Sequence, residues 1–410
     1  MSCPSHPRGD GEAVAGSIRF HELLVAQAPE YLRRFGAQMP LRQREVLQKI
    51  VRCRTPALGG QLFRCPSCRG YHLGYHSCND RHCPLCGQTD AEQWLETQRR
   101  RLLLPVRYFL VTFTVPEPLR RWMRSHPALA YALLFEASSQ ALQKLGGNPK
   151  RLGAQLALLG VLHTWSRTLI YHPHIHYLVP AGGLSPDQRH WVHPKYLKYL
   201  LNEFALGDRC RTLFREKLQK RAPAWLAQIP AQVWKQRWVA DCRPAGSGQN
   251  ALRYLSRYVF KTATGNRPLQ TLRDGRVRWP YRDSRTGAPA RLDLEPNELV
   301  RRFLEHLLPK QFSRVRWFGW FHPAGRARLN RVRALLQQAP VLTQEEQKVW
   351  LNQPTPNLAE EVSLEPPTTR YTPRCPRCGQ AMQWLARWRA GTQPPNLASL
   401  RHLIHPRAPL

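Results

Sequence analysis

Apolar residues along the chain follow two spacings, and each spacing predicts one type of element. A repeat of every three or four residues, which gathers apolar side chains on one side of a helix, predicts helices over residues 17–52, 88–103, 119–145, 249–263 and 298–308. Strands are predicted by the shorter apolar runs over residues 106–115, 156–165 and 170–179. The first of these runs is apolar on both faces, so we expect a central strand that is covered on both sides.

The remaining patterns are weaker. A mostly helical, basic region is expected up to about residue 228, followed by short strands over residues 234–239 and 276–281. Residues 314–320 mix basic and aromatic side chains. This pattern is typical of an edge strand, and equally of a nucleic-acid groove in which rings stack on bases.

Breaks in the patterns divide the chain into five parts. Residues 1–16 are expected to be a disordered leader, and residues 17–103 and 104–335 are expected to form two domains. Residues 336–373, rich in proline and acidic pairs, are predicted to be a linker, and residues 374–410 a small tail.

The charge of the chain indicates its partner. A formal net charge of +35 and an isoelectric point near 10.8 exceed what solubility requires, so we expect a polyanionic partner, with nucleic acid as the leading candidate. The 13 tryptophans and the abundant apolar sequence argue against a ribosomal or histone-like protein. The charge is therefore expected on the surface of a folded protein.

Neither a signal peptide nor a membrane span is predicted. The first 16 residues lack an apolar core, and apolar runs such as residues 102–115 are interrupted, here by Pro105 and Arg107. We expect a cytoplasmic protein.

Cysteine spacing predicts a zinc site. Of 11 cysteines, eight lie between Cys53 and Cys86 or in one late pair, and such close spacing favours zinc over disulfides in a reducing compartment. The pairs Cys65/Cys68 and Cys83/Cys86 are separated by 14 residues and supply four thiolates, the ligand set of a structural zinc.

Other ligands and cations lie nearby. Cys53, Cys78 and His82 could bind a second zinc, or Cys78 and Cys83 could exchange roles in a single site. Basic residues, among them Arg64 and Arg81, suit this module to hold DNA phosphates.

The tail carries half of another zinc site. Cys375 and Cys378 have the same spacing, and His402 and His405 are candidates to complete a partial zinc ribbon.

Three histidines predict a second kind of metal centre. His174 and His176 lie two residues apart on a predicted strand and therefore leave from the same face. His163 lies 11 residues before His174 on the preceding predicted strand, so a hairpin could bring it across as a third imidazole.

The helix predicted over residues 249–263 carries two candidate nucleophiles. Tyr254 and Tyr258 are four residues apart and are therefore neighbours on one helical face. That face is the polar one, since the apolar stripe consists of Leu252, Leu255, Val259 and Ala263. The tyrosines could still be ordinary boundary aromatics.

Cations surround the tyrosines. Lys261 lies next to Tyr254 on the helical surface, and Arg253 and Arg257 follow beyond it. A tyrosine hydroxyl becomes a usable nucleophile toward a phosphodiester when cations lower its pKa and a divalent ion polarises the phosphate. We expect Mg²⁺ or Mn²⁺ at the histidines, and a nicking and joining reaction through a covalent phosphotyrosine.

The order of the motifs resembles that of the rolling-circle insertion-sequence transposases, which join an N-terminal zinc-binding domain to a two-tyrosine HUH nuclease domain. His174-Ile175-His176 matches the histidine–hydrophobe–histidine motif of HUH endonucleases, and the step from His163 resembles the three-histidine arrangement of relaxases. The similarity extends over about residues 20 to 335 and includes the segments 53–86, 162–165, 172–176 and 254–258.

The resemblance implies an α+β fold: an HUH-type antiparallel sheet with flanking helices, preceded by a small helical, zinc-binding domain. It implies a bacterial, nucleoid-associated transposase that nicks single-stranded transposon ends and moves one strand by a rolling-circle route with help from host replication. Tyr254 and Tyr258 would be its nucleophiles, and His174 and His176 would bind the metal. The third ligand is either His163 or a different polar residue.

One departure from the family bears on the zinc. Gln61 follows Gly59-Gly60 where many relatives are expected to have histidine, which leaves the second zinc site open. Two other functions remain alternatives. One is a non-catalytic zinc-containing DNA-binding protein or regulator. The other is a plasmid replication initiator or relaxase of the same chemistry, against which the zinc-first domain order argues.

Overall fold

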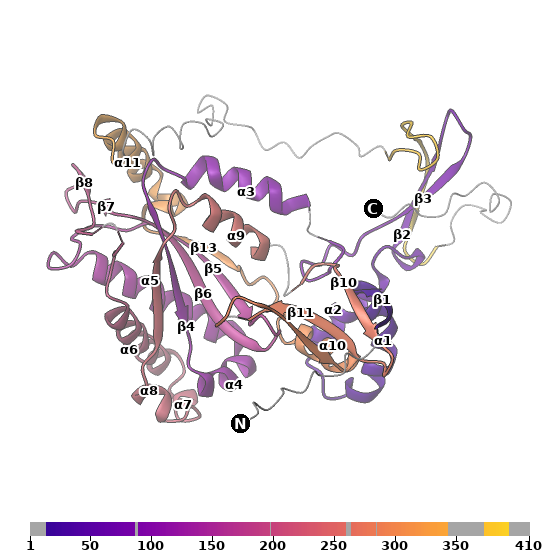
Figure 1. Ribbon diagram of the computed structural model, residues 1–410, viewed down its shortest axis with the longest axis horizontal. Coiled ribbons are helices and arrows are strands. Elements are labelled where there is room, and N and C mark those ends of the chain that lie inside the picture. Colours follow the sequence, from indigo (N-terminus) through magenta and orange to yellow (C-terminus); the bar gives the residue numbers. More distant parts are fainter. Residues whose placement is uncertain are drawn as a thin grey trace, which may run out of the picture. The chain divides into compact units, whose positions relative to one another are not determined.

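The computed structural model describes residues 14–86, 89–196, 198–259, 264–283, 285–342 and 373–392. The chain forms two compact units, both drawn in Figure 1. The larger consists of Met1–Ser17, Gln88–Thr264 and Leu269–Pro356, and the smaller consists of Ile18–Gly87, Gly265–Pro268 and Asn357–Leu410. Each unit therefore combines segments that are far apart in the sequence.

A five-stranded antiparallel sheet is the centre of the larger unit. Its order is β13-β5-β6-β4-β9, built from β4 (Tyr108–Thr114), β5 (Leu158–Trp165), β6 (Tyr171–Pro180), β9 (Val239–Pro244) and β13 (Val315–Phe318). Strands β4 and β6 pair along their lengths, as do β5 and β6. The predicted strands 106–115, 156–165 and 170–179 are confirmed, and residues 314–320 supply an edge strand.

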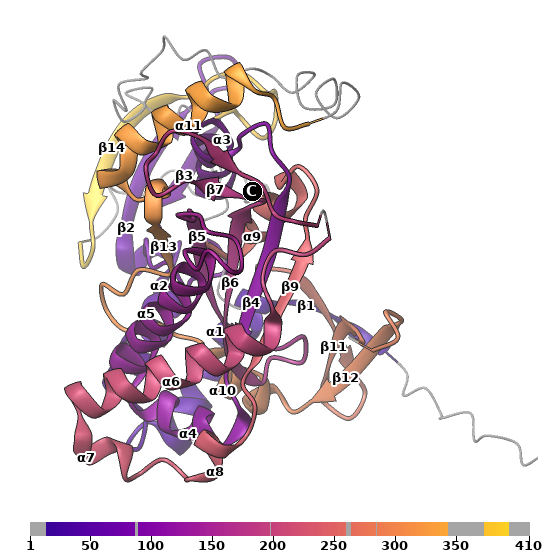
Figure 2. The same cartoon turned by 90° about the vertical axis from the view of Figure 1, so that its left-hand side faces the viewer.

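Alternation along the strands creates two hydrophobic cores. Phe109, Val111 and Phe113 of β4 pack into the core on one face, together with α5 (Pro127–Gly146) and α6 (Glu203–Arg221). On the other face, Leu159 and Val161 of β5 pack with α3 (Thr89–Leu102), α9 (Gln249–Val259) and α11 (Arg326–Gln338). Figure 2 shows α5 and α6 next to each other, and Figure 1 shows α3 beside α9.

Smaller elements complete this unit. A second sheet has the order β1-β10-β11-β12, with β1 (Val14–Arg19), β10 (Pro268–Leu272), β11 (Val277–Arg282) and β12 (Pro289–Leu294). Strands β7 (Gly183–Leu184) and β8 (Trp191–Val192) form a short pair. In the described part of this unit, the remaining α-helices are α4 (Glu117–Ser125), α7 (Pro223–Leu226), α8 (Gln232–Lys235) and α10 (Pro296–Leu304).

Where the structure describes it, the smaller unit combines two helices with a three-stranded sheet. Helices α1 (Phe20–Phe35) and α2 (Leu41–Arg52) pack against each other. The sheet has the order β14-β2-β3, from β2 (Gly59–Arg64), β3 (Tyr71–Tyr75) and β14 (Gln383–Arg389). Strand β14 thus joins the tail of the chain to its N-terminal part.

Some predicted elements are corrected. The helix predicted over 17–52 is two helices, interrupted between Gly36 and Pro40, and the helix predicted over 119–145 breaks at His126, because Pro127 lacks the N–H that would continue it. The strand predicted over 234–239 overlaps α8, and the strand in that region begins only at Val239. The helical region expected up to about residue 228 contains β7 and β8 before α6.

The predicted α+β fold, with an antiparallel sheet, flanking helices and a small helical zinc-binding domain, is confirmed. Residues 14–16 of the predicted leader belong to β1, whereas residues 1–13 and most of the predicted linker lie outside the described residues. Among the residues that the structure describes, no helix is both long and apolar enough to cross a membrane.

Candidate functional site

Two neighbouring strands place three imidazole rings together. His163 on β5 lies directly opposite His174 on β6, and His176 leaves β6 from the same face two residues later. The ring centroids are 5.2 Å apart for His163 and His174, 4.5 Å for His163 and His176, and 4.8 Å for His174 and His176. One nitrogen of each ring lies within 4.8 Å of the others, so the three predicted histidines could bind one metal ion.

Hydrogen bonds orient two of these rings. Nδ1 of His174 donates to the carbonyl oxygen of His172 at 2.6 Å, and Nδ1 of His176 lies 2.8 Å from Oγ1 of Thr112 on β4. Nε2 of His176 is buried and has no hydrogen-bond partner in the described part of the chain. This arrangement is typical of metal-binding histidines, in which one nitrogen binds the ion and the other donates a hydrogen bond.

Burial keeps the three rings neutral. It lowers the pKa of His174 to about 4 and holds the pKa of His163 and of His176 well below the usual value for histidine. The Arg120 guanidinium on α4 further lowers the pKa of His174. The rings are therefore unprotonated at pH 7, which is the form that donates a lone pair to a metal.

Sequence reasoning missed Thr112 and Arg120. Thr112 lies opposite His176 in the register of β4 and β6, and only that register reveals it. Nε of Arg120 is buried without a hydrogen-bond partner among the atoms described. The guanidinium is thus a cation near the histidines that could meet the phosphate of a bound DNA strand.

Helix α9 lies over the face of the sheet that carries the histidines. Leu252 and Leu255 are fully buried in the core beneath it, as predicted. Tyr254 is half-buried, and its ring centroid lies 5.6 Å from that of His176 and 6.0 Å from that of His163. The structure therefore brings the first predicted nucleophile next to the predicted metal ligands.

Other predicted residues of this helix are only partly described. Arg253 is exposed, and Val259 is half-buried at the end of α9. The side chains of Arg257 and Tyr258, and all of Lys261, lie outside the described residues. The helix itself places Tyr258 one turn after Tyr254.

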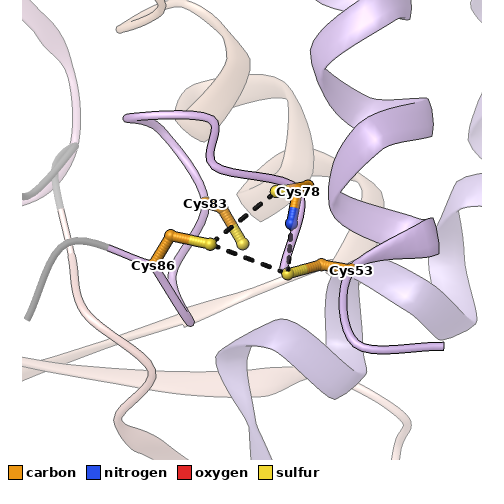
Figure 3. Close-up of side chains that lie close together, drawn as sticks. All are labelled: Cys53, Cys78, Cys83 and Cys86. Atoms are coloured by element: carbon orange, nitrogen blue, oxygen red, sulfur yellow. Dashed lines mark hydrogen bonds between the residues drawn. The ribbon is translucent and has the colours of Figure 1, made fainter. Parts of the chain in front are cut away.

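A cluster of four cysteines forms in the smaller unit (Figure 3). Cys53 ends α2, and Cys78, Cys83 and Cys86 follow β3. Sγ of Cys86 lies 3.7 Å from Sγ of Cys53 and 3.8 Å from Sγ of Cys78. Four sulfurs bound about 2.3 Å from one tetrahedral zinc are about 3.8 Å apart, so the cluster already has the dimensions of a zinc site.

This cluster corrects the predicted grouping of Cys65, Cys68, Cys83 and Cys86. Cys65 and Cys68 occupy the turn between β2 and β3, whereas Cys83 and Cys86 lie beyond the opposite end of that hairpin. Strands of about five residues separate the two ends by roughly 17 Å, which is too far for one ion. Cys65 and Cys68 instead face Cys375 and Cys378.

His82, a candidate second-zinc ligand, has another role. Its ring is buried, and its Nδ1 lies 2.8 Å from Oδ1 of Asp80. The same carboxylate oxygen accepts a hydrogen bond from the backbone N–H of His82 at 3.0 Å. Burial alone would raise the pKa of Asp80, but these hydrogen bonds and the nearby Arg42 lower it to about 2. The ionised carboxylate of Asp80 therefore stabilises the turn that carries Cys78 and Cys83.

The predicted DNA-contacting arginines lie on the surface. Arg64 is exposed at the end of β2, with its guanidinium 6.0 Å from the centre of the Tyr71 ring. Arg81 is exposed in the turn of the cysteine cluster. Both positions allow contact with a phosphate backbone.

Comparison with protein families gives two matches. A family described as "Putative transposase" matches residues 158–328, which include the three histidines and Tyr254. A family described as "Transposase zinc-binding domain" matches residues 23–115, which include the cluster of Cys53, Cys78, Cys83 and Cys86.

Two curated proteins are similar to the chain over most of its length. The chain is 35% identical to "Putative transposase y4qJ" of Sinorhizobium fredii over 319 residues, covering 72% of this chain and 80% of that protein. It is 30% identical to "Transposase for insertion sequence element IS801" of Pseudomonas savastanoi over 295 residues, covering 67% of this chain and 69% of that protein. No solved structure matches the chain significantly.

Proposed function

The chain belongs to the IS91-type insertion-sequence transposases with an N-terminal zinc-binding domain, and from this we propose that it nicks and rejoins single-stranded DNA at transposon ends through a covalent 5′-phosphotyrosine. As a transposase it acts on DNA, in accordance with its net charge of +35. The proposed setting is rolling-circle transposition at the bacterial nucleoid, completed by host replication.

One observation carries the proposal: three neutral imidazoles share one face of the sheet, and a tyrosine from the covering helix lies beside them. Tyr254 is within 6.0 Å of two of the rings, measured between ring centroids. A phosphate held at the histidines would therefore be close to a phenolic hydroxyl, which is the arrangement that nucleophilic attack requires.

The donor set fits a divalent ion. His163, His174 and His176 would hold it through one nitrogen each, and the hydrogen bonds at His174 and His176 fix which nitrogen is available. A bound Mg²⁺ or Mn²⁺ would supply Lewis-acid activation of the scissile phosphate and neutralise its charge. The exchange-labile nature of such ions suits repeated cycles of nicking and joining.

The proposed reaction balances without an external energy source. The hydroxyl oxygen of Tyr254 forms a bond to phosphorus, the bond from phosphorus to the 3′ oxygen breaks, and the phenolic proton is lost as the 3′ oxygen gains one. Rejoining reverses these changes when a 3′-hydroxyl attacks the phosphotyrosine. Tyr258, one helical turn further on, would provide the second covalent transfer.

The zinc-binding domain has a separate proposed role. We assign its zinc to Cys53, Cys78, Cys83 and Cys86, which would fix the loop after β3 to the end of α2. Arg64 and Arg81 of this unit, and Arg253 of α9, are proposed to contact DNA phosphates.

Covalent capture tests this function. Purified protein is incubated with 5′-labelled and 3′-labelled single-stranded oligonucleotides from the element's ends, with Mn²⁺ or with a chelator. The proposal expects a protein–DNA adduct that needs metal and is absent from the Tyr254→Phe, Tyr258→Phe double variant. A non-catalytic DNA-binding protein would instead bind the oligonucleotides without forming an adduct.

A further inference from the structure

Two cysteine pairs from the far ends of the chain meet in the smaller unit. Sγ of Cys65 lies 3.4 Å from Sγ of Cys378, and Sγ of Cys68 lies 3.5 Å from Sγ of Cys375. All four sulfurs are within 4.8 Å of one another. The pairs are separated by about 300 residues of sequence, and the zinc-binding family match, which ends at residue 115, includes only the first of them.

The two pairs occupy turns of the same design. Each sequence is Cys-Pro-x-Cys, and the N–H of each first cysteine donates at 2.8 Å to the carbonyl oxygen five residues later, from Cys65 to Gly70 and from Cys375 to Gln380. Each turn also has a left-handed residue after its second cysteine: Arg69 at a φ of 57° and Gly379 at a φ of 71°. Such paired turns are the ligand-bearing parts of structural zinc sites.

A strand ladder holds the two turns in place. Strand β14 follows the second turn and pairs antiparallel with β2, from Gln383 opposite Arg64 to Arg389 opposite Gly59. Figure 2 shows β14, in yellow, along β2. The tail therefore completes the β14-β2-β3 sheet, and the four sulfurs lie where its turns converge.

Packing between the strands is close enough to require glycine. A Cβ added to Gly60 would lie 2.7 Å from the ring of Trp388, and one added to Gly59, whose φ is 73°, would lie 2.5 Å from the carbonyl oxygen of Trp388. Trp388 is buried and its ring packs edge-on against Tyr75 at 6.0 Å. A Cβ on Gly60 would also lie 2.7 Å from the carbonyl oxygen of Gly74 on β3, so the Gly59-Gly60 pair allows both neighbouring strands, the tail strand included, to approach closely.

The apolar core of this sheet is small. Next to the four sulfurs it consists of Phe63 and Met382 together with Cys65 and Cys375. A core of this size does not hold a fold by itself, and small domains of this kind are commonly stabilised by a metal. The sulfur separations of 3.4 and 3.5 Å are far longer than the bond of about 2.05 Å in a disulfide.

We propose that Cys65, Cys68, Cys375 and Cys378 bind a second structural zinc, which completes a zinc ribbon built from the two ends of the chain. The tail is then an integral part of the N-terminal unit. Any truncation that removes Cys375 and Cys378 also removes half of the ligands of this zinc. The site is independent of the nuclease chemistry proposed above.

Zinc content and cysteine alkylation test the site in the full-length protein. The double variant Cys375→Ser, Cys378→Ser should contain one zinc fewer per chain than the wild type, measured by mass spectrometry of the metal. Its Cys65 and Cys68 should become alkylated, whereas the four cysteines of the Cys53 cluster stay protected. The matched control is Cys242→Ser, a half-buried cysteine outside both clusters, which should keep the full zinc content.

Cys210, buried in the core of the larger unit, reports whether that unit folds in the variant, and the continued protection of the Cys53 cluster reports whether the smaller unit folds. A second measurement needs no variant. We expect Cys378 and Cys65 to resist alkylation in the zinc-loaded wild type and to react once the zinc is chelated. Because Cys378 is exposed, its protection would come from the metal. Rapid alkylation of Cys378 before chelation, or an unchanged zinc content in a folded double variant, would overturn the proposal.

Discussion

Replacement of Thr112 by valine should weaken metal binding at the three histidines. Oγ1 of Thr112 lies 2.8 Å from Nδ1 of His176, and Nε2 of that ring is the nitrogen left for the ion. Metal binding at Nε2 requires the proton on Nδ1, from where it is donated to Thr112. Valine has nearly the same shape as threonine but cannot accept this hydrogen bond.

The expected loss of metal affinity can be worked out from the metal-bound form of the variant. With metal present, the variant leaves a buried N–H of His176 without a partner, at a cost of about 1–3 kcal/mol. Without metal the ring can carry its proton on Nε2, so the cost falls mainly on the metal-bound form. At about 1.4 kcal/mol per tenfold, this corresponds to a loss of roughly 5- to 150-fold in affinity. Partners of metal-binding histidines typically contribute about 10- to 100-fold.

Calorimetric titration with Mn²⁺ at pH 7 measures this loss directly. Thr114→Val is the matched control: Thr114 follows on the same face of β4, opposite His174, but Nδ1 of His174 donates to the carbonyl oxygen of His172. We expect Thr112→Val to lose affinity and Thr114→Val to keep it. Equal affinity of the wild type and Thr112→Val, or equal losses in the two variants, would refute the assigned role of the hydrogen bond.

Three further results are expected. In thermal unfolding, Asp80→Ala should destabilise the smaller unit by about 1.5–3 kcal/mol, because the carboxylate accepts two hydrogen bonds from His82. The control Glu45→Ala removes only a more exposed ion pair with Arg42 and should cost less than about 1 kcal/mol in the same experiment. Burial lowers the pKa of His306 to about 4, so the unfolded chain binds more protons between pH 4 and 6.5. The unfolding free energy should therefore fall from pH 7 toward pH 4, less steeply in His306→Gln. Finally, the affinity for single-stranded DNA should fall steeply with salt, by a slope of about −0.7 per phosphate contact, and a flat response would contradict phosphate-dominated binding.

The proposed nuclease site was predictable because its residues lie close in sequence. His174 and His176 share a strand, and a hairpin of ordinary length brings His163 across to them. Helical spacing likewise separates the buried Leu252 and Leu255 from Tyr254. Local periodicity thus determines these positions, whereas Thr112 depends on the pairing of β4 with β6, which no local pattern in the sequence specifies.

The cysteine grouping could not be predicted from spacing. Cys65 and Cys68 are nearer in sequence to Cys83 than to Cys375. They lie, however, at the tip of the β2–β3 hairpin, whereas Cys83 and the other cysteines of its cluster lie at the opposite end of that hairpin. The turn before β14, the strand that pairs with β2 after about 300 residues, then supplies their partners. Spacing identified the residue type and chemistry, but only the sheet shows which sulfurs meet.

Helix ends were also set by single residues within longer patterns. The apolar repeat over 119–145 continues through His126, yet Pro127 starts a new helix because its ring fixes φ and removes a donor. Likewise, the apolar repeat over 17–52 does not indicate that the helix is interrupted between Gly36 and Pro40. Periodicity therefore predicted helical structure in both regions correctly and misplaced the boundaries.

The central claim is that a tyrosine of α9 becomes joined to DNA beside the three histidines. Its most direct test is tandem mass spectrometry of the peptide that remains attached to a 5′-phosphorylated nucleotide after the metal-dependent reaction with a transposon-end oligonucleotide and digestion. We predict that the modified residue is Tyr254 or Tyr258 and that adduct formation is lost in His174→Ala. A covalent link at any other residue, or an adduct that forms equally in His174→Ala, would contradict it.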